Sequence, residues 1–149
     1  MKYEKSAGAI VYYVNKEIKF LLLKYPTYWG FAKGLVEENE KEEETAVREL
    51  EEEAGLKGKI IPGFKFKQEW FFRLNNETKK KKATFFLVKV SEEEAEKVKI
   101  SFEHEEFAWL TFSEAIEKMK IKSNKEMLRK AYEFIFKFEK QKTIFNSVS

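Results

Sequence analysis

The feature that most constrains the fold is the stretch from Gly34 to Leu56, an acidic segment with a glycine at its start and another near its end. Apolar residues recur inside it with the period of an α-helix, at Ala46, Val47, Leu50 and Ala54. A helix with this pattern has one apolar face, which another part of the chain must cover. The remainder of the fold is therefore expected to provide a surface on which this helix packs.

Both ends of this helix carry local signals. Asn39 is expected to be the N-cap, because Glu42 follows three residues later in a capping-box arrangement. Acidic residues fill the first turns, where the helix dipole stabilises negative charge. Gly55 stands where helices commonly end in a left-handed residue. The sequence thus predicts a helix between Asn39 and Gly55.

Three glutamates of this helix, Glu49, Glu52 and Glu53, are spaced so that they project on one side. A run of charges is often only a solvated face. Here, however, few cations stand four residues away, so the carboxylates repel one another, and a divalent ion would reverse this repulsion. Oxygen clusters suit Mg²⁺ or Mn²⁺, and Lys33 beside Gly34 suits phosphate. The residues predict a site for metal and phosphate.

The stretch resembles the Nudix box, whose fixed residues correspond to Gly34, Glu40, Arg48, Glu49, Glu52, Glu53 and Gly55, with apolar residues at Leu50 and Leu56. The resemblance implies an enzyme that uses water and a divalent metal to hydrolyse a nucleoside diphosphate linked to another group, X. It also implies that Glu49, Glu52 and Glu53 bind the metal, and that one of them, or a glutamate outside the box, is the base. Arg48, Glu40 and the two glycines would support the site.

Outside this stretch, apolar patterns predict strands at residues 6–14, 18–24, 31–33, 57–61, 64–73, 83–90 and 107–110, and helices at 91–97 (one turn), 113–120 and 124–140. Strands and helices that alternate in this way predict a mixed sheet with helices on both faces. This α+β architecture agrees with the α/β/α sandwich that the Nudix resemblance implies. A single domain over residues 1–149 is expected, with a loose tail from about residue 141.

Some finer expectations concern the connections. Asn75 to Glu77 is expected to be a hairpin tip, and Ser113 to cap the helix that follows it. The lysine run Lys79–Lys82 is interpreted as a solubilising loop or, alternatively, as a segment that draws polyphosphate towards the site.

The composition excludes several kinds of chemistry. The chain has no cysteine, no aspartate and one histidine, His104, so disulfides, Ser-His-Asp or Cys-His catalysis and a His/Cys zinc site are all excluded. A net charge of +3 is too small to argue for nucleic-acid binding. No apolar run is long enough to cross a membrane, and no signal segment is apparent. We expect a cytoplasmic protein, monomeric or homodimeric, that binds nucleotides rather than nucleic acid, with an RNA 5′ end as the one exception.

Beyond the box, the chain resembles the asymmetrical diadenosine tetraphosphate hydrolases, at Phe20–Leu23, Trp29, Lys33–Gly34, Gly63–Phe64, Lys81, Phe102–Glu105 and Trp109–Leu110. The resemblance implies that Glu103 joins the metal site or acts as base. It further implies that Lys33 and Lys81 bind the phosphate chain, with His104 close to it. Each of these residues has a purely structural alternative: a surface strand position for Glu103, and a satisfied buried position for His104.

The same resemblance implies that adenine lies between Tyr132 and one aromatic among Trp70–Phe72, where stacking contributes roughly 1–3 kcal/mol. A place in the core is the alternative for these rings. The sequence departs from this branch at Leu35, where a histidine is common, and at Ala32, where the branch has proline. Other Nudix substrates therefore stay open: ADP-ribose, oxidised nucleoside triphosphates or 5′-triphosphate RNA. A nucleotide-sensing module without catalysis is a further alternative.

Overall fold

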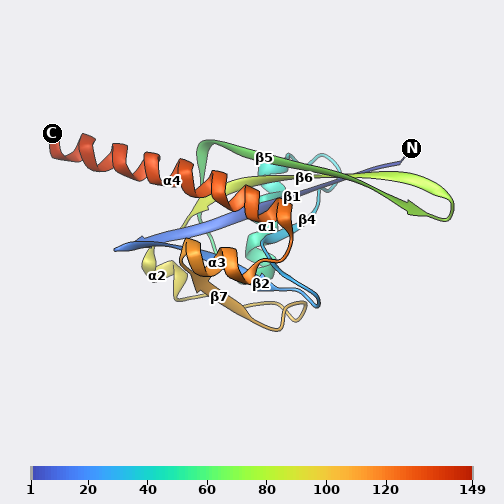
Figure 1. The fold of residues 1–149 in the computed structure, drawn as a ribbon, viewed down its shortest axis with the longest axis horizontal. Coiled ribbons are helices and arrows are strands. Elements are labelled where there is room, and N and C mark those ends of the chain that lie inside the picture. Colours follow the sequence, from blue (N-terminus) through green and yellow to red (C-terminus); the bar gives the residue numbers. More distant parts are fainter. Residues whose placement is uncertain (1, 149) are drawn as a thin grey trace.

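The computed structural model describes residues 2–148, with the side chains of residues 4–142. Its strands are β1 (Lys2–Asn15), β2 (Glu17–Lys24), β3 (Trp29–Gly30), β4 (Ala32–Leu35), β5 (Lys59–Leu74), β6 (Glu77–Lys89) and β7 (Phe107–Leu110). Its helices are α1 (Glu42–Ala54), α2 (Glu92–Ala95), α3 (Phe112–Lys118) and α4 (Lys122–Val148). Figure 1 shows the helices on both sides of one twisted sheet. Among the described residues, no helix is long and apolar enough to span a membrane.

The sheet is mixed, with the order β3-β2-β1-β6-β5. Strand β1 is parallel to β6, while the other pairs are antiparallel. Two strands share the edge of β1 that faces away from β6: β2 pairs with the last residues of β1, and β4 pairs with its middle. Since β4 leads directly into the loop before α1, this division places the glycine loop at the centre of the sheet.

Two apolar layers hold the helices on the sheet. Successive side chains of a strand point to opposite faces, so Ile10 and Tyr12 of β1 contact the layer that contains α3 and α4. Ala9 and Val11 contact the opposite layer, which includes Leu50 of α1. All four β1 side chains are buried. The expected α+β sandwich, with a mixed sheet between helices, is confirmed.

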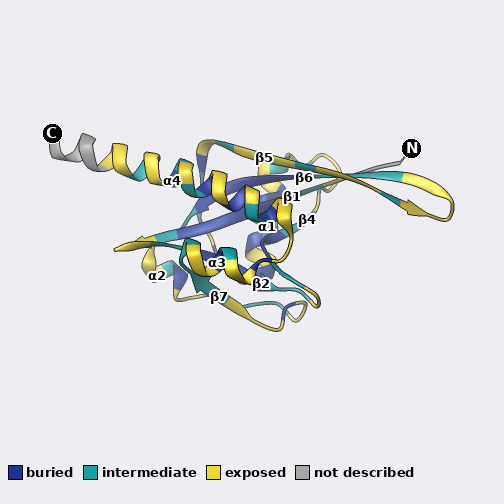
Figure 2. Ribbon diagram, viewed as in Figure 1, coloured by how far each residue is buried: buried dark blue, intermediate teal, exposed yellow. Residues whose placement is uncertain are grey.

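Strands β5 and β6 form a long hairpin that extends well beyond the helices (Figure 1) and whose tip is exposed (Figure 2). The tip is at Asn75 and Asn76, as predicted, and both residues have positive φ angles of 52° and 63°. Two neighbouring left-handed residues make the tight turn that matches the twist of a hairpin. Because β5 and β6 continue to this tip, the projecting part of the hairpin is β-strand except at the two turn residues.

Two predictions for this hairpin were wrong. Lys79–Lys82 is not a loop but part of β6, where it pairs with β5 on one side and with β1 on the other. The two strands predicted at 57–61 and 64–73 are one strand, β5, with an irregular register between Ile60 and Lys65. Gly63, with a φ angle of 99°, allows the strand to continue through this irregularity.

The start of α1 also differs from the prediction. Asn39 has a φ angle of 65° and precedes the N-cap, which is Lys41. The capping glutamate is Glu44, whose carboxylate accepts a hydrogen bond from the Lys41 N–H at 3.0 Å. The helix begins later than expected because residues 37–40 form a turn, closed by the Glu40 N–H to Glu37 C=O bond of 3.0 Å. The end at Gly55 is confirmed by its φ angle of 67°.

Thr111, not Ser113, caps α3. Its hydroxyl accepts from the Glu114 N–H, and the Glu114 carboxylate accepts from the Thr111 N–H, which completes a capping box. Helix α4 begins at Lys122 and continues to Val148, so the expected tail from residue 141 is helical up to that residue, and Ser149 lies outside the described residues. The division into one domain stays a prediction.

Candidate active site

Glu53 lies at the centre of the candidate site and is 3% exposed. One carboxylate oxygen accepts a hydrogen bond from the Lys33 backbone N–H at 2.9 Å. The other lies 2.8 Å from His104 Nε2 and 3.3 Å from the Tyr25 hydroxyl, which donates to it. Strand β4, the loop after β2 and the segment before β7 therefore all converge on one side chain of α1.

Glu49 is the neighbour of Glu53 one helical turn earlier, and the two carboxyl groups are hydrogen-bonded to each other. Burial raises the pKa of Glu49. The pKa of Glu53 is raised to about 8 by burial first, then by Glu49 and by the charge of Glu103. Two carboxyl groups this close cannot both ionise easily.

The segment that carries Glu103 is bound to the C-terminal end of α1 by its backbone. The Ser101 N–H donates to the Glu53 carbonyl at 3.0 Å, and the Lys99 N–H donates to the Ala54 carbonyl at 2.9 Å. These carbonyls have no partner inside the helix, so they are free to bind another segment. As a result, ligand atoms of Glu53, Glu103 and His104 lie within 4.8 Å of one another.

Arg48 connects α1 to the loop that follows β4. Its guanidinium binds both oxygens of Glu40, at 2.8 and 3.1 Å, and it donates to the Leu35 carbonyl at 3.0 Å. It also donates to Glu49 at 2.9 Å. Hydrogen bonding to Arg48, and then to Thr45, lowers the pKa of Glu40 to about 2. Arg48 and Glu40 thus lie where a supporting role was expected.

The structure brings together three of the four carboxylates predicted as metal ligands: Glu49, Glu53 and Glu103. Glu52 is different, because its side chain is 57% exposed and faces Arg48 at 3.2 Å. His104 is fully buried at its side chain and contacts Glu53 and the Lys24 carbonyl, as well as the edge of Tyr25. His104 is therefore placed to hold the Glu53 carboxylate in one orientation. The catalytic roles of all these residues stay predictions.

The donor set fits a hard divalent cation. Its carboxylates are the oxygen ligands that Mg²⁺ and Mn²⁺ prefer, and the raised pKa of Glu53 favours a proton on that carboxyl group in the absence of metal. A cation would compete with that proton, because a carboxylate must be deprotonated to bind metal. Glu49, Glu53 and Glu103 are thus the residues suited to hold it.

We expect the metal-free protein to lose stability as the pH rises towards 8. The pKa of Glu53 is raised from 4.5 to about 8 on folding, so between these values the folded state binds more protons than the unfolded state. The free energy of unfolding then falls with increasing pH, and the contribution of Glu53 is fully present only below about pH 4.5. Urea unfolding in chelator at several pH values should show this slope, and Glu53→Gln should remove it. An unchanged slope in the variant would contradict the assignment.

Replacing Gly34 by alanine should disturb Glu49. A Cβ atom at position 34 would overlap the Glu49 carboxyl group, which must then move. A displacement of a reacting group by about 1 Å can cost roughly 100-fold in rate, so we expect kcat to fall by about 10- to 100-fold. Thermal unfolding would establish that Gly34→Ala is folded. Full activity in a folded variant would show that the position of Glu49 is not critical.

A cavity of about 540 Å³ lies beside this centre, between the sheet and the start of α4. Its lining includes Lys33, Trp70, Tyr28, Gln68 and Asn124. The Lys33 ammonium lies 5.8 Å from the centre of the Trp70 ring. Burial, and then the charge of Lys81, lowers the pKa of Lys33, which means that the two lysines predicted to bind phosphate are close enough to repel each other. An anion between them would relieve that repulsion.

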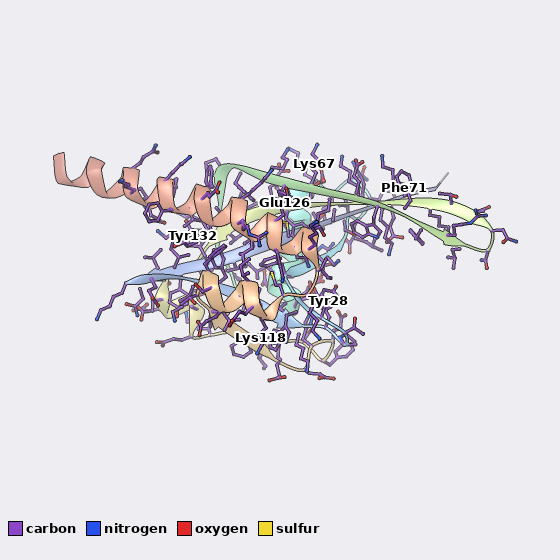
Figure 3. All side chains as sticks on the ribbon, viewed as in Figure 1. Tyr28, Lys67, Phe71, Lys118, Glu126 and Tyr132 are labelled. Atoms are coloured by element: carbon purple, nitrogen blue, oxygen red, sulfur yellow. The ribbon has the colours of Figure 1, made fainter. Side chains whose placement is uncertain are left out.

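The predicted pair Tyr132 and Trp70 does not line one cavity. Tyr132 stacks on Phe112, with ring centres 4.4 Å apart, and packs on the core. It borders a different hollow, near Lys16 and Phe136. Figure 3 shows Tyr132 farther along α4 than Glu126, which borders the cavity with Trp70. Tyr28, rather than Tyr132, therefore lines the cavity together with Trp70.

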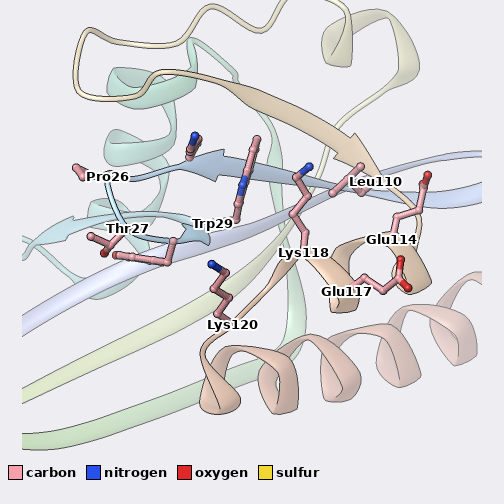
Figure 4. Close-up of a pocket in the computed structure, with 10 residues that line it drawn as sticks. Pro26, Thr27, Trp29, Leu110, Glu114, Glu117, Lys118 and Lys120 are labelled. Atoms are coloured by element: carbon pink, nitrogen blue, oxygen red, sulfur yellow. The ribbon is translucent and has the colours of Figure 1, made fainter.

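A second hollow, of about 700 Å³, is also lined by Tyr28, and Figure 4 shows it between Trp29 and Lys118. Its walls include Trp29 of β3 and Lys118 of α3, and the Lys118 ammonium is 4.9 Å from the centre of the Trp29 ring. Tyr28 borders both hollows. Two cavities thus meet at the aromatic loop that also carries Tyr25.

Tyr25 is the site residue that the sequence did not single out. Its hydroxyl donates to the Phe31 carbonyl at 2.7 Å as well as to Glu53, and its ring stacks on Tyr28 at 4.7 Å. Burial, and then the charge of Glu53, raises the pKa of Tyr25, which keeps the hydroxyl protonated. The only signal was three aromatics in one short loop, which is equally typical of a core cap.

Comparisons with known proteins agree with this geometry. The NUDIX domain matches residues 2–131. The asymmetrical bis(5′-nucleosyl)-tetraphosphatase of Sus scrofa is 32% identical over 127 residues, covering 81% of this chain and 83% of that protein. The Caenorhabditis elegans enzyme of the same name is 29% identical over 138 residues, covering 90% and 98%.

Solved structures give the same result. The C. elegans Ap4A hydrolase in a binary complex has a TM-score of 0.70 at 26% identity, covering 89% of this chain and 97% of that one. The E. coli dihydroneopterin triphosphate pyrophosphohydrolase, at 20% identity and a TM-score of 0.69 with 87% and 97% covered, shares the fold. The box residues, the sandwich and the family match all lead to one conclusion: the chain belongs to the Nudix family and is a Nudix pyrophosphohydrolase.

Proposed function

We propose that this Nudix hydrolase cleaves diadenosine tetraphosphate into ATP and AMP with the help of Mg²⁺ or Mn²⁺. The observation that carries the proposal is the position of the Glu49, Glu53 and Glu103 carboxylates beside two cavities that share Tyr28. A dinucleoside substrate has two planar bases at the ends of one phosphate chain. Aromatic side chains in both cavities suit such bases. The relatives named bis(5′-nucleosyl)-tetraphosphatase and Ap4A hydrolase support this choice of substrate.

The reaction adds water across one phosphoanhydride bond. The water oxygen attaches to phosphorus, the bridging oxygen leaves with the other nucleotide, and one of the three carboxylates accepts the proton of the water. A bound divalent cation supplies charge neutralisation on the phosphate oxygens. Lys33 and Lys81 attract the phosphate chain, while Tyr25 and His104 keep the Glu53 carboxylate in its orientation.

A nucleotide panel tests the proposal. Diadenosine tetraphosphate, ADP-ribose, an oxidised nucleoside triphosphate and a 5′-triphosphate RNA are each incubated with the protein and Mg²⁺, and kcat/KM is determined by chromatography. We expect the highest kcat/KM for diadenosine tetraphosphate. A higher value for any other compound would assign the enzyme to that substrate, and no turnover of any compound would favour a sensing module.

The Trp70→Ala variant tests the role of the cavity. Without the Trp70 ring, one base of the substrate loses its stacking partner, and KM should rise by roughly fivefold or more. Phe136→Ala is the matched control, because Phe136 is also an exposed aromatic, 54% exposed, and borders a different hollow. Equal KM values in the two variants would exclude Trp70 from substrate binding.

A further inference from the structure

The positive charge of the chain is concentrated in the β5–β6 arm, which we define as Lys65–Leu74 and Glu77–Lys82. These residues include seven lysines and arginines and two glutamates, a net charge of +5. Because the whole chain has a net charge of +3, the remainder has a net charge of −2. The small total charge therefore conceals a basic arm on a nearly neutral remainder, and Figure 1 shows that the hairpin extends beyond the helices.

The two faces of the arm differ. Side chains that are directly opposite on paired strands share a face, so Trp70 shares one face with its partner Lys81, next to the cavity described above. The other face, which we call the Phe71 face, carries Lys5, Lys67, Glu69, Phe71, Arg73, Lys80 and Lys82, by the register of β1, β5 and β6. Among its described residues the acidic side chain is Glu69, 3.2 Å from Lys80.

Phe71 is the central residue of this face and is 61% exposed. It lies opposite Lys80, whose ammonium is 5.8 Å from the ring centre. Figure 3 shows Phe71 on the arm beyond the helices, while Lys67 is nearer to the start of α4. An exposed aromatic ring costs solubility, and basic side chains on all sides of it would repel a second copy of the same face.

We propose that the Phe71 face binds single-stranded nucleic acid. Basic side chains that follow a strand can contact successive phosphates, while an exposed aromatic ring stacks on a base of any sequence. The bases of a duplex are stacked on one another and cannot reach Phe71, so the combination favours a single strand. The residues of one strand of the arm, Lys65 to Leu74, span about 30 Å, which is long enough for several nucleotides.

This binding is separate from hydrolysis. Lys33 and Trp70 line the catalytic cavity and are not on the Phe71 face, whereas Lys67 of this face also borders that cavity. Variants of Lys5, Phe71, Arg73 and Lys82, which do not border the cavity, should therefore retain the turnover of the small nucleotide substrate. Conversely, a protein that hydrolyses none of the nucleotides in the panel would still bind nucleic acid, so the two proposals can fail independently.

The electrostatic part is tested by fluorescence anisotropy with a labelled RNA of about 12 nucleotides at several salt concentrations. Each contact between a basic side chain and a phosphate contributes about 0.7 to the slope of log K against log salt. The triple variant Lys5→Ala, Arg73→Ala, Lys82→Ala should reduce that slope by about 2. The control triple variant Lys122→Ala, Arg129→Ala, Lys137→Ala removes equal charge from exposed positions of α4 and should leave the slope nearly unchanged.

The stacking part is tested with Phe71→Ala, which should weaken binding of the single strand by roughly tenfold and should not affect a duplex of the same sequence. DNA and RNA single strands distinguish a preference for either sugar. Equal slopes in the two triple variants, or duplex binding as tight as single-strand binding with no effect of Phe71→Ala, would overturn the proposal.

Discussion

The Glu53→Gln variant should remain folded and lose turnover by roughly 10²- to 10⁴-fold. Glutamine retains the shape of the side chain and can still accept the hydrogen bond from the Lys33 N–H, which is 2.9 Å long. It cannot bind a cation as a carboxylate, and it cannot accept a proton from water. Steady-state kinetics with Mg²⁺, together with a thermal melt of the same sample, separates the loss of chemistry from a loss of folding.

Glu51→Gln is the matched control for this experiment. Glu51 is in the same helix but is exposed and faces Lys57 at 3.8 Å rather than the site. It should retain nearly the full rate, because its removal leaves the carboxylate cluster intact. A wild-type rate in Glu53→Gln, or an equal loss in both variants, would contradict the position of the catalytic centre.

The Arg48→Ala variant should lose both stability and activity. Without the guanidinium, Glu40 and Glu49 lose their charged partner, and the Leu35 carbonyl loses a donor. Hydrogen bonds to charged groups contribute about 1.5–3 kcal/mol, which corresponds to a fall in melting temperature of about 5–10 °C for a chain of this size. The loop after Gly34 would also lose its attachment to α1, and activity should fall by at least about tenfold.

Arg129→Ala provides the control, since Arg129 is exposed on α4. The pKa of Glu40 offers a more specific readout, because Arg48 is the largest cause of its depression to about 2. In Arg48→Ala, NMR titration should show this pKa returning towards 4.5. A pKa that stays near 2 would mean that other contacts hold the Glu40 carboxylate.

The parts of the site that the sequence could predict are those within one helix or one short motif. Arg48, Glu49 and Glu53 lie in one helix, so their proximity follows from helix geometry, while Gly34 was predicted from its place in the motif. Even there, the helix start was misplaced, because the side chain of Glu40 is bound by Arg48 and its backbone closes a turn. A local capping pattern carries no information about such a contact.

Contacts between distant segments were harder to predict. The place of Glu103 beside Glu53 depends on backbone hydrogen bonds from Lys99 and Ser101 to the end of α1, which leave no pattern in the side chains. The hydrogen bond from the Tyr25 hydroxyl to the Glu53 carboxylate likewise joins two segments that are distant in the sequence. The lysine run was taken for a loop because lysine is uncommon in strands, yet pairing on both sides of β6 stabilises it as a strand.

We propose that this carboxylate centre hydrolyses diadenosine tetraphosphate asymmetrically, and the products of the reaction reveal which bond is cleaved. The compound is incubated with the protein and Mg²⁺, and the nucleotides are separated by chromatography over time. We expect ATP and AMP in equal amounts, with negligible product from Glu53→Gln. Formation of ADP alone, or the same product at the same rate from Glu53→Gln, would contradict it.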